Sequence, residues 1–396
     1  MSIATRGCIE IGSDHRFKDG QHIGGDTFLC RRSANGERTI SVLSDGLGSG
    51  VKAGVLSTLT ATMALNCVER NVPIERTARV IMETLPVCRT RRISYATFTI
   101  VDIDRDGHAR IIEYDNPIYV LLRGGELVEP PRTTIEVGRR TGERARLHFS
   151  EIDAAVGDRI IFFSDGVSQS GMGTAAHPLG WGDDGARAAL SSAVAREPGI
   201  SARRLAQRLV RESLRRDAES AHDDITCGVI YFRQPRRLLV ATGPPLDPRV
   251  DGELADRIRG FPGRCIIAGG TTGNIVAREL GVKPHIVLHD LDPEVPPYAQ
   301  MDGVEMVTEG IITLAKVGDY LDAGTPQEWL PRNAAGLMTE HLLDSDAIEF
   351  VVGTRINQAH QDPNVPMQLE LRRNMVGRVR DLLQRKYLKD VTISYV

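Results

Sequence analysis

Residues 40–50 read ISVLSDGLGSG, and they join a β-rich run to an aspartate, a glycine-rich turn and the start of a helical pattern. The run at 40–43 is typical of a short strand leading into Asp45. The glycines at 48 and 50 permit a tight passage into a helix expected at about 51–69. Apolar residues recur there at helical spacing, namely Val51, Val55, Leu59 and Met63. The stretch therefore predicts an aspartate between a strand end and the foot of a helix.

Three more acidic motifs occur in the first 230 residues: Gly24-Gly25-Asp26, Ser164-Asp165-Gly166 and His222-Asp223-Asp224-Ile225-Thr226. A single Asp-Gly pair is most often a turn. Here, however, strand-like runs at 159–163 and 225–232 flank the later motifs. When different parts of a sheet bring several aspartates to one place, their oxygens can surround a hard divalent cation. Magnesium and manganese prefer such ligands to Cys or His.

These motifs carry a family resemblance over residues 1 to about 233. The chain there resembles the metal-dependent serine/threonine protein phosphatases of type 2C, and most of all the bacterial branch typified by the stage II sporulation protein E phosphatase. The matching stretches are residues 24–26, 44–50, 157–158 with 164–167, and 223–226. The resemblance implies an α+β fold, in which a layered helix-sheet-sheet-helix phosphatase sandwich is followed by a smaller α/β domain that it does not cover.

The resemblance also implies which residues hold metal. Asp45 and the carbonyl of Gly46 match the motif that bridges two ions, and Asp26 matches the acid that completes the shell of the second ion. A metal site of this kind activates water for attack on a phosphoryl group. We therefore expect two manganese or magnesium ions as cofactors, and no cysteine or serine nucleophile.

The remaining implied ligands come from the later motifs. Asp165 and Asp223 match the other carboxylates of the first ion, and Asp45 and Asp165 are the residues expected to be catalytic. Asp224 occupies the next place in the family pattern. We prefer Asp223 as the ligand, but neighbouring acids are not separable by sequence alone.

The implied activity is that of a hydrolase, a protein serine/threonine phosphatase in bacterial signalling. Its substrate would be a small phosphorylated regulatory protein, such as an anti-sigma-factor antagonist. Two alternatives stay open. One is an inactive phosphatase fold that serves as a regulatory or binding protein, and the other is a phosphatase acting on a small-molecule phosphate ester.

Composition limits the other classes of function. The 396 residues are 41% hydrophobic and 26% charged, which is a globular balance, and the net charge of −3 argues against a nucleic-acid partner. The six cysteines form no C-x-x-C pair. No run approaches the ~18 apolar residues of a membrane span, and the N-terminus has no apolar signal core. We expect a cytoplasmic protein without membrane association.

A Pro-Arg-rich linker at 233–237 predicts a boundary between a phosphatase domain at 1–234 and a second domain at 238–396. Strand-like and helical runs alternate in the second domain, which predicts an α/β fold with a partly parallel sheet. The turn GGTTG at 269–273, between a strand and a helix expected at 274–280, either binds an anion or is simply tight. The domain is therefore expected to be regulatory, with a small anionic ligand or a protein partner.

Other motifs have plainer interpretations. Residues 102–107 with Glu113 fit a calcium-loop pattern, but β-rich flanks favour a hairpin turn. Arg16 and Lys18 are candidates for a phosphate clamp, although solvated loop charges are the commoner case. The acids Asp290, Asp292, Glu294 and Glu309 are interpreted as loop residues. The arginines at 372–385 are interpreted as a solvated helix face. The helix after Gly50 is either a rigid core element or a switch.

Overall fold

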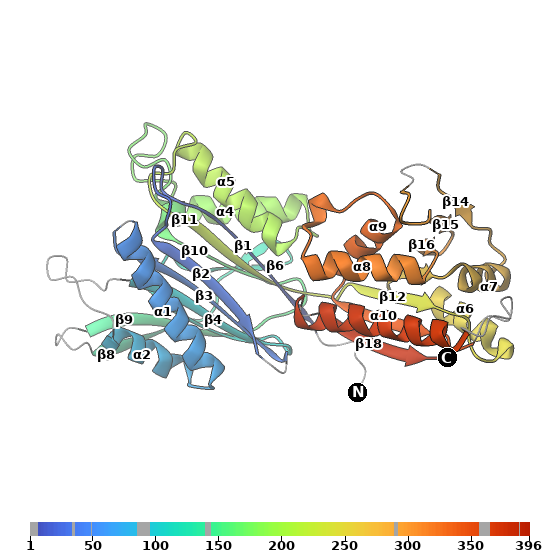
Figure 1. Cartoon of the computed structure of the whole chain (residues 1–396). Helices are drawn as coiled ribbons and strands as arrows, with labels where there is room; N and C mark the ends of the chain where they lie inside the picture. Colours follow the sequence, from blue (N-terminus) through green and yellow to red (C-terminus); the bar gives the residue numbers. More distant parts are fainter. Residues whose placement is uncertain are drawn as a thin grey trace. The chain divides into compact units, whose positions relative to one another are not determined.

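The computed structural model describes residues 7–33, 36–48, 50–84, 96–138, 144–288, 292–355, 365–387 and 389–396 (Figure 1). Ser49 and Asp290, named above, lie outside these ranges. The chain divides into two compact units, Met1–Gln234 and Pro235–Val396. Each unit is built around its own sheets.

Two antiparallel sheets form the first unit. One has the strand order β2 (Asp26–Arg32), β3 (Arg38–Gly46), β4 (Ala96–Asp104), β5 (His108–Tyr114), β9 (Arg144–Asp153), β8 (Thr133–Gly138). The other has the order β1 (Cys8–Arg16), β11 (Ile225–Arg233), β10 (Arg159–Phe163), β6 (Val120–Arg123), β7 (Glu126–Val128). The helices of this unit are α1 (Val51–Glu69), α2 (Ile74–Thr84), α3 (Asp165–Ser168), α4 (Gly182–Arg196) and α5 (Ala202–Arg216).

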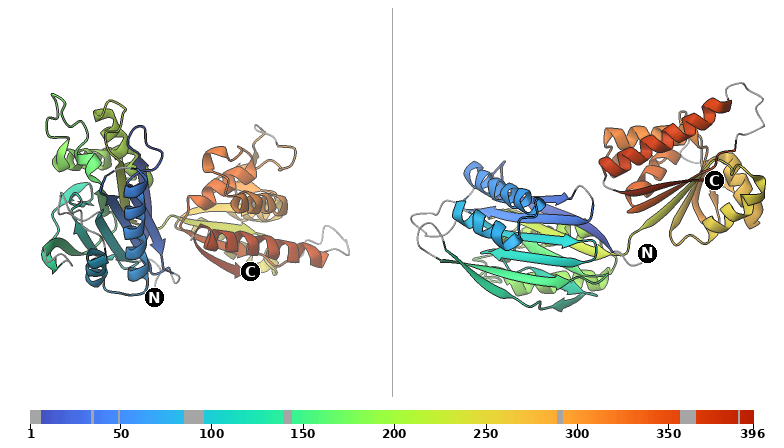
Figure 2. Two further views of the ribbon diagram at one scale, coloured as in Figure 1. Left: turned by 60° about the vertical axis from the view of Figure 1, so that its left-hand side comes forward. Right: turned by 90° about the horizontal axis from the view of Figure 1, so that it is seen from below.

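Three buried clusters define the layers of this unit (Figure 2). Val42 packs with α1 and α2 on one outer face, whereas its neighbour Leu43 packs between the two sheets. In β10, Phe162 packs between the sheets and Ile161 packs under α4 and α5. Successive strand residues point to opposite faces, so continuous apolar runs are what a sheet buried on both faces requires. The predicted helix-sheet-sheet-helix sandwich of the α+β class is confirmed.

The face that α1 buries differs from the one its large apolar residues suggest. Val51, Val55 and Leu59 are exposed, at 62%, 60% and 47%. The buried face consists mostly of small residues: Ala53, Gly54, Ser57, Thr60, Ala61, Ala64, Leu65 and Val68. Small side chains let a helix approach a sheet closely, and close approach is what the contacts below require. The prediction of the helix is therefore confirmed, but the face is corrected.

Helix α1 differs from the expectation that no segment is long and apolar enough to span a membrane. It is the one helix in the described ranges with the length and apolar composition to cross a membrane. Core helices that pack inside a domain pass the same test. In α1, Ala64, Leu65 and Val68 pack against the sheet that holds β3 and β4.

Glycines in the motifs bring α1 into backbone contact with the strand ends. A Cβ atom on Gly46 would lie 2.1 Å from the carbonyl oxygen of Ala53. A Cβ atom on Gly54 would lie 2.6 Å from the carbonyl oxygen of Gly24. Real Cβ atoms do not come this close, so no larger residue fits at either position without a backbone shift. The first turn of α1 therefore rests directly on the backbone of two acidic motifs.

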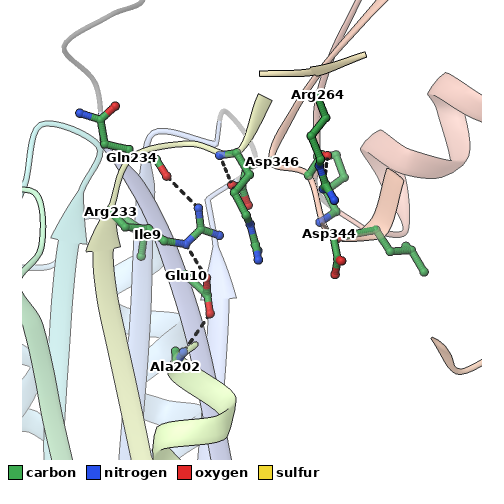
Figure 3. A network of polar contacts seen from close by, with 12 residues as sticks. Ile9, Glu10, Ala202, Arg233, Gln234, Arg264, Asp344 and Asp346 are labelled. Atoms are coloured by element: carbon green, nitrogen blue, oxygen red, sulfur yellow. Dashed lines mark hydrogen bonds and ion pairs between the residues drawn. The ribbon is translucent and has the colours of Figure 1, made fainter. Parts of the chain in front are cut away.

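A polar contact fixes the start of α5 (Figure 3). The Glu10 carboxylate on β1 accepts hydrogen bonds from the backbone N–H of Ala202, at 2.8 Å, and from Nε of Arg233 on β11, at 2.5 Å. A carboxylate at the first turn of a helix is also favoured by the helix dipole. This contact ties the outer helix to two paired strands.

The second unit is an α/β domain, as predicted. Its sheet has the order β14 (His285–Ile286), β15 (Ala299–Met301), β16 (Val304–Thr308), β13 (Arg264–Ala268), β12 (Arg237–Thr242), β17 (Ala347–Val352), β18 (Asp390–Tyr395). The last five strands in this order are parallel, and the first two form an antiparallel edge.

Helices cover both faces of this sheet. One face packs against α6 (Asp251–Arg259) and α7 (Gly270–Leu280). The other packs against α8 (Ile311–Ala323), α9 (Ala334–Leu343) and α10 (Val365–Arg385). Short 3₁₀ turns lie at η2 (Pro248–Val250) and η3 (Gln327–Trp329). The glycine-rich turn is shorter than expected, because Gly270 already begins α7.

We predict that Gly46→Ala destabilises the protein by about 1–3 kcal/mol, because the added methyl group overpacks the contact with the Ala53 backbone. Urea denaturation measures the change. The control is Gly199→Ala, since nothing lies within 4 Å of a Cβ atom at that position. Equal midpoints for Gly46→Ala and the wild type would contradict the close packing of α1.

Candidate metal centre

Two sheets deliver the predicted carboxylates to one place. Asp26 begins β2 and lies directly opposite Asp45 in the β2–β3 ladder. Asp165 begins α3 immediately after β10, and Asp223 and Asp224 precede β11. The backbone N–H of Ser164 donates to the carbonyl of Thr226 at 3.0 Å, which keeps the ends of β10 and β11 together.

Asp45 lies at the centre of this group. Burial raises the pKa of its carboxyl well above the usual value, and the negative charges of Asp26, Asp165, Asp223 and Asp224 raise it further. Its carboxyl also lies near that of Asp165, whose pKa is likewise raised, first by burial and then by the charge of Asp223. The structure thus brings all five predicted carboxylates into electrostatic contact.

The carboxylate of Asp26 lies in an unfavourable environment. Both of its carboxylate oxygens are buried and have no hydrogen-bond partner among the described residues. Burial raises its pKa to about 7, and the charges of Asp224 and Asp165 add to the shift. The hydroxyls of Ser164 and Thr226 lie close enough to lower this pKa, but neither donates to Asp26 with hydrogen-bond geometry. A buried, unpaired carboxylate is costly unless a cation accompanies it.

Asp224 serves the protein itself. Its Oδ2 accepts the backbone N–H of Gly25 at 2.6 Å, and its Oδ1 accepts that of Lys18 at 2.9 Å. It is 5% exposed, whereas Asp223 is only half-buried. Because both oxygens of Asp224 already hold the loop before Asp26, this geometry favours Asp223 as a metal ligand. No sequence pattern distinguishes these two roles, because they depend on contacts with residues about 200 positions away.

The donor set fits a hard divalent cation. It consists of carboxylates and the Gly46 carbonyl, with an orphaned carboxylate at Asp26, and magnesium or manganese prefer such ligands. In the described residues, however, no group of three or more His, Cys, Asp or Glu side chains is already arranged to hold an ion. The side chains would therefore have to reorient to hold an ion together.

Two neighbouring residues, Gln169 and Lys18, also affect the charged state of the carboxylates. The side-chain amide of Gln169 donates to Oδ2 of Asp165 at 2.6 Å. Sequence reasoning missed this contact, although the spacing of four residues on a helix could have indicated it. The pKa of Asp223 is raised by burial, and the positive charge of Lys18 partly opposes that shift. Lys18 is therefore the clamp candidate whose charge reaches the carboxylates.

Arg16 and His222, two other charged or titratable residues near the acidic motifs, lie in different surroundings. Arg16 is exposed and lines a hollow with Asp14, Arg211 and Arg215. His222 is 3.6 Å from Asp217, and its side chain is 64% exposed. A cavity of about 560 Å³ lies between α4 and α5, and none of the predicted metal ligands lines it. Five arginines line this cavity: Arg196, Arg204, Arg208, Arg211 and Arg215.

Two alternative sites are disfavoured by the structure. The calcium-like pattern at 102–107 is a hairpin between β4 and β5, as predicted, and Asp102 pairs there with Arg38 and Arg110. Cys227 and Arg233 have the Cys-x5-Arg spacing of thiol phosphatases, but both lie within strand β11. Full burial raises the pKa of the Cys227 thiol far above its usual value, so it is no nucleophile.

We predict that the metal-free protein loses stability as pH rises from about 4, the ordinary value for aspartate, to about 7. In that range native Asp26 keeps a proton that the unfolded chain has lost, so the native state binds more protons and stability falls. Saturating magnesium or manganese should flatten this dependence. Asp26→Asn should raise the melting temperature of the metal-free protein at pH 8 and remove most of the stabilisation by metal.

Thermal unfolding with and without chelator tests this prediction, since 1 kcal/mol corresponds to about 2–4 °C for a domain of this size. The matched control is Asp115→Asn, because Asp115 is exposed and has a positive φ of 52°, which asparagine tolerates. A lower melting temperature for metal-free Asp26→Asn at pH 8 would mean that Asp26 is a structural residue.

The family comparison matches residues 35–233 to the model of the stage II sporulation protein E (SpoIIE) family. No curated protein matches the chain. Among solved structures, one similar to this chain is the phosphatase domain with a regulatory fragment of SpoIIE from Bacillus subtilis. It is 20% identical, with a TM-score of 0.48, and the match covers 58% of this chain and 64% of that one, slightly under two thirds of its length.

Two further solved structures are similar. The RsbU and RsbW domains of a Mycobacterium tuberculosis protein are 19% identical, with a TM-score of 0.46 and coverage of 65% of this chain and 68% of that one. The SiaA phosphatase domain of Pseudomonas aeruginosa is 19% identical, with a TM-score of 0.42 and coverage of 56% and 85%.

Proposed function

Because this chain belongs to the stage II sporulation protein E family, we propose that it is a metal-dependent phosphatase that hydrolyses phosphoserine or phosphothreonine on a regulatory protein. The observation that carries the proposal is Asp26. Its buried and unpartnered carboxylate lies opposite Asp45, within a group of five acids that no described basic residue neutralises by an ion pair. Such a group is unfavourable in a protein that binds no cation there.

Some residues of the site would bind the ions, and others keep these ligands in position. Asp45 and the Gly46 carbonyl would bridge two ions, Asp26 would complete one shell, and Asp165 and Asp223 would complete the other. When bound, the ions supply an activated water and neutralise phosphoryl charge. Asp224 keeps the Gly25 loop in position, and Gln169 orients the carboxylate of Asp165.

The residues around the acids also favour a phosphoryl substrate. The charge of Lys18 reaches Asp223, so a cation lies beside the carboxylates, where it can attract and orient a phosphate group. The described thiol with phosphatase-like spacing is buried within a strand. Attack by water, rather than by a protein nucleophile, is the chemistry that this set of residues supports.

We predict that turnover of a phosphoserine peptide requires added manganese or magnesium and stops in excess chelator. Asp45→Asn should lower kcat/KM by roughly 100-fold or more, because a bridging ligand serves both ions. Arg16→Gln should change it little, since Arg16 lies beside α5. Release of phosphate from the peptide measures the rate.

The same assay separates the alternatives. If the protein binds manganese but turns over neither a phosphoprotein nor a small phosphate ester, the inactive regulatory protein is the better description. Turnover of small esters alone would assign a small-molecule substrate. Undiminished peptide turnover in chelator would refute the metal mechanism.

We further predict opposite phenotypes for the two adjacent acids. Asp223→Asn should weaken manganese binding by about 10-fold or more and leave the metal-free melting temperature nearly unchanged. Asp224→Asn should lower that melting temperature, because one of the two backbone N–H groups loses a charged acceptor. Calorimetric titration and thermal unfolding of both variants decide the assignment. The reverse pattern would identify Asp224 as the ligand.

A further inference from the structure

The second unit has a topological switch point. From β12 the chain passes through α6 to β13 on one side, and from β17 it passes through α10 to β18 on the other. Helices α6 and α10 cover opposite faces of the sheet. In open parallel sheets, ligands bind outside the carboxyl ends of the strands at such a point. Position alone is no evidence of a site, so the groups at this edge decide the question.

Unpartnered polar atoms gather at this edge. The described part of the second unit has three buried hydroxyls without a hydrogen-bond partner, Oγ1 of Thr272, Thr308 and Thr313. A fourth atom without a hydrogen bond, Oδ1 of Asp251, lies 3.6 Å from the guanidinium of Arg355 in an ion pair. Thr308 ends β16, and the other three lie in the first turns of α6, α7 and α8. All four residues therefore follow the carboxyl ends of parallel strands. Buried hydroxyls are normally satisfied, so this concentration needs an explanation.

The hydroxyl of Thr272 points toward Gly269. A Cβ atom built on Gly269 would lie 3.4 Å from Oγ1 of Thr272, 3.7 Å from the carbonyl of Glu309 and 3.8 Å from the backbone N of Gly243. Thr272 is fully buried. Polar groups that follow β12, β13 and β16 thus surround a position that the missing side chain of Gly269 leaves open.

The two neighbouring helix N-termini differ. Helix α8 is capped by the chain itself, because the backbone N–H of Ile312 donates to the Glu309 carboxylate at 2.9 Å. The N-cap residue of helix α7 is Gly269, which has no side chain to accept a hydrogen bond from the first turn. A helix of 11 residues with an uncapped N-terminus attracts an anion. The buried hydroxyl of Thr272 lies in that same first turn.

Arg372 supplies a cation at the same edge. It extends from α10, is half-buried, and donates to the carbonyl of Gly353, after β17, at 3.3 Å. A Cβ atom on Gly243, after β12, would lie 2.5 Å from its guanidinium, so glycine is needed there to admit it. Among the described residues no carboxylate lies within ion-pair distance of Arg372. The sequence-based view of this arginine as part of a solvated helix face is therefore incomplete.

We propose that the carboxyl edge of this sheet binds a phosphorylated small molecule, such as a nucleotide or sugar phosphate. Its phosphate would sit between the first turn of α7 and the guanidinium of Arg372, and the hydroxyl of Thr272 would donate to it. Glycine at 243 leaves room for the guanidinium where it lies, and glycine at 269 places no side chain beside the hydroxyl of Thr272. This proposal does not depend on the activity of the first unit.

The test is titration of the full-length protein with ADP, ribose 5-phosphate and inorganic phosphate, followed by calorimetry and thermal unfolding. Chelator is present throughout, so that phosphate cannot bind through metal at the first unit. We expect at least one probe to bind and raise the melting temperature. Arg372→Gln should weaken that binding about 10-fold or more, which is the usual loss for a charge-assisted hydrogen bond. Arg373→Gln is the matched control, because Arg373 lies over the Tyr395 ring instead.

A second variant keeps the test decisive if Arg372→Gln unfolds. Thr272→Val removes the buried hydroxyl without changing the shape of the side chain. We expect the ligand-free protein to stay as stable as the wild type or become more stable, since the hydroxyl has no partner to lose, while the probe binds several-fold more weakly. Three results would overturn the proposal: no probe binds, Thr272→Val leaves binding unchanged, or Arg373→Gln weakens binding as much as Arg372→Gln.

Discussion

Repulsion among five carboxylates, gathered where two sheets end and α1 begins, is the constraint to which the first unit is built. Burial withdraws these groups from water, and each negative charge raises the pKa of its neighbours. Left alone, they would push the strand ends apart. The three apolar clusters of the sandwich oppose this tendency. A divalent cation would replace this repulsion with attraction between the ion and the carboxylates, so that part of the free energy of metal binding would stabilise the fold.

The backbone, rather than side-chain packing, holds the acids in place. Asp26 and Asp45 face each other across a ladder of hydrogen bonds, and Asp224 fastens the Gly25 loop to the start of β11. Glycines then let α1 settle directly on that backbone. A shift of α1 would therefore act directly on the backbone of Gly46, which follows Asp45 at the end of β3.

Much of this arrangement follows from local sequence. Mainly apolar runs such as 159–163 predict strands because a sheet buried on both faces favours apolar side chains at successive positions, and an aspartate shortly after such a run marks a strand end. The motifs thus predicted the five acids, which the structure brings together. What local sequence could not separate was Asp223 from Asp224, because the difference depends on two N–H groups about 200 residues away.

The errors have physical causes of the same kind. Helical periodicity identified Val51, Val55 and Leu59, but the sheet accepts only the small face of α1, because the motif glycines demand backbone contact. The sequence of its own helix predicts a surface charge at Arg372, because nothing there indicates the glycine at 243 that lies beside its guanidinium. The glycines at 46 and 54 favour the small face of α1, whereas the glycine beside Arg372 lies far away from it in the sequence.

The two units also suggest how regulation would have to work. A ligand at one site changes the other only if it binds two states of the protein with different affinity. Asp26 and Asp45 are poor candidates for the element that moves, because their backbone lies in the paired strands β2 and β3. Helix α1 is a better one, since its first turn is joined to the metal ligands through a few close backbone contacts and its outer face carries exposed apolar side chains. A signal therefore need not touch a carboxylate. It is enough that it favours one position of α1, because that helix packs directly on the backbone of Gly46 and Gly24.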